Sequence, residues 1–136
     1  LIPFPTTISD MPPREFYKKT DILISATGTT TLDAALSPVP VIILGALSPL
    51  TYLIAKYILR IKMAFMGLPN IIAKKKITPE FIQNRLQPQS IAEKVEALCK
   101  TPQRETVLDA YTTLKKELLK QKNPFTTISQ YLQKYV

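Results

Sequence analysis

The stretch DILISATGTTTLDAAL, residues 21–36, decides the fold of this chain. Its first part, DILIS, is a continuous apolar run of strand length, which is typical of a parallel strand buried on both faces. Residues 30–36 have the composition of a short helix, and that helix should start near Thr29. A strand that leads through a short loop into a helix predicts one unit of an α/β fold.

The loop between this strand and this helix is a candidate ligand site. It holds Gly28, one of only 3 Gly in 136 residues, among four threonines. Ligands of open α/β sheets bind beyond the carboxyl ends of the strands. The free N–H groups and the dipole at a helix N-terminus attract phosphate there. We therefore predict a phosphate-bearing ligand, although a strand-to-helix turn capped by threonine is an alternative.

Each residue of the loop has an expected role. Gly28 would let the backbone approach a ligand without an intervening Cβ. Thr27, Thr29 and Thr30 could add hydroxyl donors. Asp33, one turn into the helix, could accept hydrogen bonds from a ribose diol. The loop lacks both GxxxxGK[ST] and GxGxxG, so neither phosphate-binding motif applies.

The same pattern continues outward in both directions. Residues 1–5 suit the end of a strand, and further strands are predicted over 39–44 and 63–67. Helices are predicted over 12–20, 48–62, 78–86, 90–100, 105–120 and 124–136, with a loop and short turn over 68–76. Ser9 or Asp10 should cap the first helix, and Thr78 should cap the one that has Pro79 at its first position. Alternating strands and helices predict a parallel sheet.

Composition narrows the classes of function. A net charge of +8, from 18 Lys and Arg against 10 acids, favours anionic partners. Lys and Arg are spread along the chain without an aromatic-interleaved motif, so a nucleic-acid-binding domain is disfavoured. There is no His and one cysteine, Cys99, which argues against a His/Cys metal site and a histidine base. We expect Cys99 to be a small buried hydrophobe and the compartment to be reducing.

No secretory signal is visible in the sequence. The first ten residues lack the basic start of a secretory signal. No window reaches the roughly 20 apolar residues of a membrane span. The segment TYLIAKYILRIK, residues 51–62, combines aliphatics, tyrosines and three cations, so it could lie on a membrane surface, but a helix packed in the core is favoured.

Five motifs in register resemble the C-terminal half of bacterial lipid-A-disaccharide synthases. They are SATGTTTLDAAL from Ser25, VIIL after Pro40, LSPLTYLIAKYILRIK from Leu47, LPNIIA from Leu68 and PEFIQ from Pro79. The resemblance implies the nucleotide-sugar-binding half of a GT-B glycosyltransferase, with a Rossmann-like parallel sheet flanked by helices. Residues 1–100 would form a partial UDP-sugar-binding domain. Residues 101–136 would be C-terminal helices that pack on it or on a partner domain.

The resemblance also implies an activity. Such enzymes transfer sugar from UDP-2,3-diacylglucosamine to 2,3-diacylglucosamine 1-phosphate, with inversion and without a required metal or cofactor. They are peripheral at the cytoplasmic face of the bacterial inner membrane. The expected partners are these two lipids, the membrane surface, an N-terminal domain with the acceptor site and the base, and a second copy held through the C-terminal helices. No catalytic base is assigned here, because Asp10, Asp21 and Asp109 have no motif to recommend them.

Position by position, the resemblance assigns a donor site. The Thr27-Gly28-Thr29 loop matches the family's Ser-Gly-Thr and would face the diphosphate. Asp33 stands where the family has glutamate, the expected ribose contact. Asn70, Glu80 and Gln83 match positions at the donor cleft. From the residues alone, these three read as a turn residue, a helix-start acid and a solvated surface amide.

The sequence also departs from the family pattern. Gly45 and Ala46 stand where the family has an aromatic residue followed by Lys or Arg. The family's AGR sequence after LPN reads Ala73-Lys74-Lys75 here, and Lys74 to Lys76 could supply substitute charge or form a solvated run. The alternative to an enzyme is therefore a non-catalytic or degenerate nucleotide-binding module.

Overall fold

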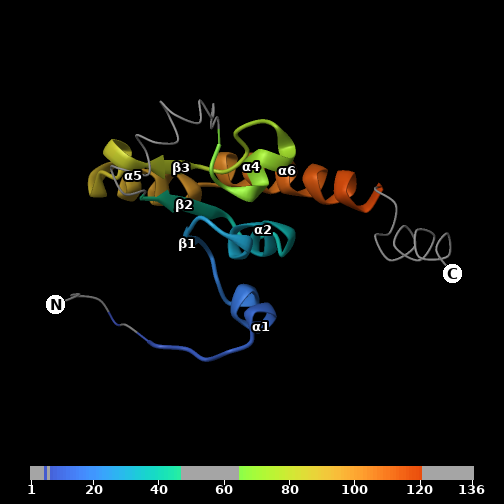
Figure 1. Cartoon of the computed structure of the whole chain (residues 1–136). Helices are drawn as coiled ribbons and strands as arrows, with labels where there is room; N and C mark the ends of the chain where they lie inside the picture. The colour runs from blue at the N-terminus through green and yellow to red at the C-terminus, as the bar shows by residue number, and fades with distance from the viewer. Residues whose placement is uncertain (1–4, 6, 47–64, 121–136) are drawn as a thin grey trace, which may run out of the picture.

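A computed structural model describes residue 5 and residues 7–46 and 65–120 of the chain (Figure 1). The predicted helices over 48–62 and 124–136 lie outside these residues. The described elements are α1 (Pro13–Lys18), β1 (Leu23–Ala26), α2 (Thr29–Leu36), β2 (Val41–Gly45), α4 (Leu68–Ala73), β3 (Glu80–Ile82), the 3-10 turn η2 (Gln83–Arg85), α5 (Pro88–Cys99) and α6 (Thr101–Lys120). None of the described helices is long and apolar enough to cross a membrane.

The three described strands form a parallel sheet in the order β1-β2-β3, which confirms the predicted α/β fold. Leu23 pairs with Val41, and Ile43 pairs with Glu80. The side chains of Val41, Ile42 and Ile43 are fully buried, as expected for a central parallel strand. Helix α2 makes the crossover from β1 to β2 (Figure 1).

Strand β1 is buried on one side only, so the prediction of burial on both faces is wrong. Its residues alternate between half-buried and exposed, and the side chain of Ile24 is 48% exposed. The face of β1 that carries Ile24 is left largely uncovered by the described elements. Strand β1 also pairs with β2 alone among the described strands, so it forms an edge of this sheet. Edge strands keep one row of backbone groups free for pairing.

Two hydrophobic clusters hold the described elements together. In the first, Tyr17 of α1 and Ala34 of α2 pack on Val41 and Ile43 of the sheet. In the second, Tyr111 and Leu114 of α6 pack on residues of α2 and α4, such as Ala35. The Tyr111 hydroxyl accepts a hydrogen bond from the Val41 N–H at 3.3 Å. Helix α6 therefore contacts the strands as well as the helices. The predicted domain boundary at residue 100 stays a prediction.

The third strand is not where the pattern placed it. Residues 65–67 of the predicted strand 63–67 are irregular, and residues 63–64 lie outside the described part. The strand is instead 80–82, inside the predicted helix 78–86. Strand β2 decides this, because its Ile43 N–H bonds to the Pro79 carbonyl at 2.9 Å and draws the segment into the sheet. Thr78 is consequently no helix cap, and its hydroxyl pairs with that of Tyr111 at 3.0 Å.

Two other local predictions need correction. Residues 68–73 form helix α4 rather than a loop, with Pro69 in its first turn and Lys74 ending it in the left-handed conformation at a φ of 52°. Helix α1 has no side-chain cap. The hydroxyl of Ser9 accepts the Met11 N–H at 3.2 Å instead, so neither Ser9 nor Asp10 caps the helix.

Candidate functional site

The loop between β1 and α2 lies at the carboxyl edge of the sheet, as predicted. Strand β1 ends at Ala26 and helix α2 begins at Thr29. Residues 27–30 are all exposed. Gly28 occupies the N-cap position, and within residues 7–46 and 65–120 no side chain caps the start of the helix. The alternative of a turn capped by threonine is therefore wrong, and the helix start is open to a ligand from outside this part of the chain.

The chain's own packing does not explain why position 28 is glycine. The Gly28 backbone is extended, and a Cβ added there would meet nothing within 4 Å. Neither strain nor crowding among the described residues therefore demands a glycine. The lack of a side chain leaves the outer face of the loop bare, which agrees with the predicted close approach of a ligand.

Thr31, in the first turn of α2, is the residue next to this loop that sequence reasoning missed. Its side chain is fully buried, and its hydroxyl donates a hydrogen bond to the Gly28 carbonyl at 2.7 Å. This bond holds the loop against the first turn of α2. A threonine three residues after a candidate N-cap was the available signal, because such hydroxyls bond back to the preceding turn.

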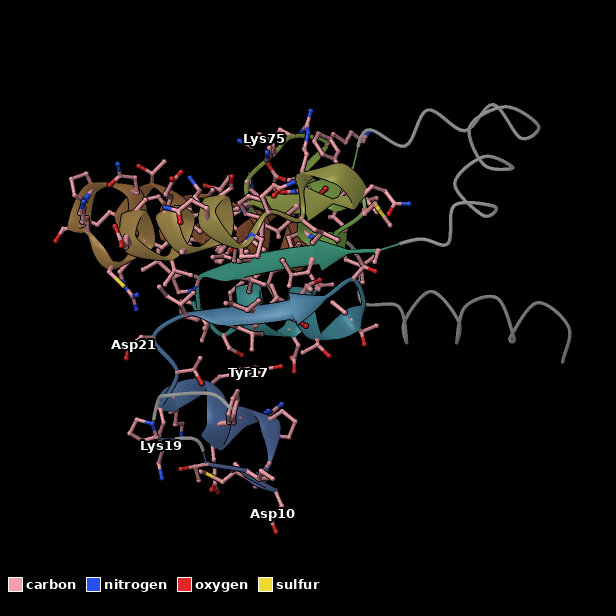
Figure 2. The ribbon with its side chains drawn as sticks, turned by 90° about the vertical axis from the view of Figure 1, so that its left-hand side faces the viewer. Asp10, Tyr17, Lys19, Asp21 and Lys75 are labelled. Carbon is pink, nitrogen blue, oxygen red and sulfur yellow. The ribbon has the colours of Figure 1, made fainter. Side chains whose placement is uncertain are left out.

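Asp33 is exposed on α2 and interacts with Tyr17 of α1. Figure 2 shows Tyr17 between α1 and the strands. Burial raises the pKa of the Tyr17 hydroxyl, and the negative charge of Asp33 and the hydrogen bond between the two side chains raise this pKa further. Asp33 thus has a partner within the chain, and its predicted ribose contact stays a prediction.

Asn70 is fully buried in α4 and uses both ends of its amide. Its oxygen accepts the N–H groups of Ile77 and Thr78 at 2.7 and 2.8 Å. Its nitrogen donates to the Thr78 carbonyl at 2.8 Å and to Glu80 Oε1 at 2.7 Å. Asn70 is therefore more than a turn residue, because it joins α4 to the segment that enters β3.

Glu80 opens strand β3, so the alternative of a helix-start acid is wrong. Its side chain is 8% exposed, and its Oε1 also accepts the Gly67 N–H at 2.8 Å. Its Oε2 accepts the Met66 N–H at 3.1 Å. The negative carboxylate thus lies at the amino end of α4, where it is stabilised by the positive end of the helix dipole. Gln83 follows β3 directly with a φ of 53° and is half-buried, so it is not a solvated surface amide.

The predicted site residues fall into two groups. Residues 27–30 and Gln83 follow the carboxyl ends of β1 and β3, at one edge of the sheet. Asn70 and Glu80 lie in the interior below that edge, bonded to each other. The described residues bring together no group of three or more His, Cys, Asp or Glu that could hold a metal ion. Cys99 is exposed at the end of α5, so the prediction that it is buried is wrong, and its neighbour Leu98 fills the core instead.

The parallel sheet with an open helix start at its carboxyl edge defines a Rossmann-like α/β unit. Comparison with known proteins then gives the family. A family model described as lipid-A-disaccharide synthetase matches residues 4–132, and the chain belongs to that GT-B family.

Individual relatives carry the name lipid-A-disaccharide synthase. The chain is 43% identical to the one from Sulfurihydrogenibium sp. over 83 residues, which cover 61% of the chain and 21% of the relative. It is 35% identical to that of Acinetobacter baylyi over 106 residues, 78% of the chain and 26% of the relative. With Cellvibrio japonicus the identity is 28% over 118 residues, 86% of the chain and 30% of the relative. The chain thus spans less than a third of the length of these relatives.

Proposed function

We propose that this chain provides the UDP-sugar donor site of a glycosyltransferase of lipid A biosynthesis. The reaction would join UDP-2,3-diacylglucosamine to 2,3-diacylglucosamine 1-phosphate and release UDP. The observation that carries the proposal is the open start of α2 at the carboxyl edge of the sheet, formed by the loop that carries the family motif. Binding of UDP by Thr27, Gly28, Thr29 and Thr30 follows from it.

The chemistry of this loop suits the departure of UDP. Negative charge grows on the diphosphate as the bond from the sugar carbon to the phosphate oxygen breaks. The dipole of α2, its free N–H groups and the exposed threonine hydroxyls would stabilise that charge. Asp33 would bind the ribose after exchanging its Tyr17 contact, and Gln83 would contact the donor from the end of β3.

The proton of the attacking acceptor hydroxyl requires a base. Asp21 precedes the amino end of β1, at the sheet edge opposite the loop, and Asp10 lies before α1 (Figure 2). Asp109 is exposed on α6. We assign the base to none of these and propose that it comes from an N-terminal domain that faces this one. Association with the cytoplasmic face of the inner membrane and a homodimer formed through the C-terminal helices belong to the same proposal.

Calorimetry with UDP tests the site. Thr29→Val combined with Asp33→Ala should weaken binding by about 1–3 kcal/mol, the scale of lost hydrogen bonds to charged groups. Thr113→Val with Asp109→Ala repeats the same chemistry on exposed residues of α6 and should leave the affinity unchanged. Tyr17→Phe separates the two roles of Asp33, the contact with Tyr17 and the proposed contact with the ribose. This variant removes the tyrosine hydroxyl and keeps the Asp33 carboxylate. Unchanged affinity in a folded Thr29/Asp33 variant would exclude the site.

A second candidate function is a nucleotide-binding module that transfers no sugar. Gly45 is buried at the end of β2, and a Cβ there would lie 3.2 Å from Met66 Sδ and 3.4 Å from Ile82 Cγ1. A side chain at this position, as the family has, would therefore require the Met66 side chain to shift by a few tenths of an ångström. UDP binding without transfer, by a protein that contains both Rossmann-like domains, would favour this candidate.

A further inference from the structure

Met66 lies at the carboxyl edge of the sheet, beside the ends of two strands. Gly45 and Ile82 are the last residues of β2 and β3, and they pair with each other. A Cβ placed on Gly45 would meet Met66 Sδ at 3.2 Å and Ile82 Cγ1 at 3.4 Å. The Met66 thioether therefore lies against the space that the glycine leaves free, and the residue is half-buried there.

The backbone of Met66 is held in place by Glu80. Glu80 Oε2 accepts the Met66 N–H at 3.1 Å, and Oε1 accepts the Gly67 N–H at 2.8 Å. Gly67 packs so closely on Ile43 that a Cβ there would collide with the Ile43 Cδ1. Because Ile43 also packs with Ala34 of α2, the segment that carries Met66 lies on the face of the sheet that α2 covers.

Met66 and Asp33 lie on opposite sides of α2. Asp33 interacts with Tyr17 of α1. Ala35 of the same helix packs in the cluster that includes Ile72 of α4, and Met66 comes just before α4. Helix α2 accordingly lies between α1 and α4 (Figure 1). The open loop at the start of α2 thus has Asp33 on its α1 side and Met66 on its α4 side.

This arrangement separates the two arms of a nucleotide sugar. With the diphosphate at residues 27–30 and the ribose at Asp33, the nucleoside would lie on the α1 side of the loop. The sugar is attached at the other end of the diphosphate, so it would extend to the α4 side, over the ends of β2 and β3. Adjacent strands are about 4.8 Å apart, so Met66 lies roughly 5–10 Å across the sheet from the loop, within reach of that sugar.

We propose that Met66 contacts the sugar of the donor and is a specificity-determining residue of this site. The inference rests on the proposed donor site and adds to it a residue for the sugar. A thioether is apolar, polarizable and adaptable, so it can cover C–H groups of the sugar ring and its substituents. Gly45 and Glu80 are positioning residues, since Gly45 leaves room for the thioether and Glu80 fixes its backbone.

Calorimetry with two ligands tests this role in the full 136-residue chain. The ligands are UDP and UDP-2,3-diacetylglucosamine, a soluble short-chain form of the proposed donor. The parent protein should bind the sugar nucleotide more tightly than UDP, because the sugar adds the contact with Met66. Met66→Ala should weaken binding of the sugar nucleotide by roughly four- to fifteenfold, the scale of one or two buried methylene-sized groups. The same variant should keep its UDP affinity, which also shows that it is folded.

Three further variants separate a ligand contact from internal packing. Met66→Leu keeps an apolar side chain of similar volume and should retain most of the contribution of the sugar. Gly45→Ala should lower this contribution by a smaller factor than Met66→Ala, because Met66 must shift by a few tenths of an ångström. Met11→Ala removes a methionine from the segment before α1 and should change neither affinity.

Equal losses for both ligands in Met66→Ala would overturn the inference, because Met66 would then support the fold or the nucleoside side of the site. The inference also fails if the parent protein binds both ligands equally, or if Met66→Ala changes neither affinity. These results would leave the donor site standing. A parent protein that does not bind UDP would instead remove the donor site itself, and the inference with it.

Discussion

Replacing Asn70 with alanine should lower the free energy of unfolding by about 3–5 kcal/mol, because it removes four buried hydrogen bonds at 2.7–2.8 Å. Three backbone groups lose their partner, namely the N–H groups of Ile77 and Thr78 and the Thr78 carbonyl. Each buried polar group left unpaired costs roughly 1–3 kcal/mol, and a plain sum would be larger than our value. We reduce it because neighbouring losses do not add and water can enter the space. Glu80 keeps its bonds to two backbone N–H groups.

Urea unfolding of the Asn70→Ala variant measures this loss. Domains of this kind have a total stability of roughly 5–15 kcal/mol, so the variant should be close to unfolding. Gln103→Ala, which removes an exposed amide on α6, is the matched control and should change the stability by less than about 0.5 kcal/mol. A folded Asn70→Ala variant that keeps its stability and loses UDP affinity would refute the reasoning, because Asn70 would then be a ligand contact and not a structural link.

Three further predictions concern stability and activity. Gly67→Ala should destabilise the protein by roughly 1–3 kcal/mol in thermal unfolding, because the new Cβ would collide with Ile43 Cδ1. An unchanged stability would mean that α4 can shift away from Ile43 without cost. Burial raises the pKa of Tyr111 above its ordinary 10.0. The free energy of unfolding that depends on this hydroxyl staying neutral is therefore fully present below pH 10.0, and it is lost as the pH rises further. Tyr111→Phe should flatten this alkaline decline in urea unfolding, and an unchanged slope would contradict the assignment. The 136-residue chain alone should form no disaccharide from both lipid substrates. Its unfolding midpoint should be low and should rise when further sequence pairs with the β1 edge. A monomeric chain that unfolds cooperatively and makes disaccharide would contradict this.

The sequence by itself determined the parts of the fold that depend on local pattern. In DILISATGTTTLDAAL, an apolar run, a glycine among small polar residues and a helical segment became β1, the open loop and α2. Helices α5 and α6 followed from apolar residues that recur at the helical period, because that period reports one buried face. The likeness to lipid-A-disaccharide synthases rested on motifs in the same register, and the family match over residues 4–132 confirms it.

Tertiary structure decided what depends on residues far apart in the chain. Residues 80–82 have no strand pattern of their own and became β3 because β2 offered an unpaired edge. Asn70 and Glu80 read as a turn residue and a helix-start acid until α4 and β3 came together around them and excluded water. Met66 lies beside Gly45 only because Glu80 binds the Met66 N–H next to the end of β2. A local pattern records which face of an element is buried, and it carries no information about which other element covers that face.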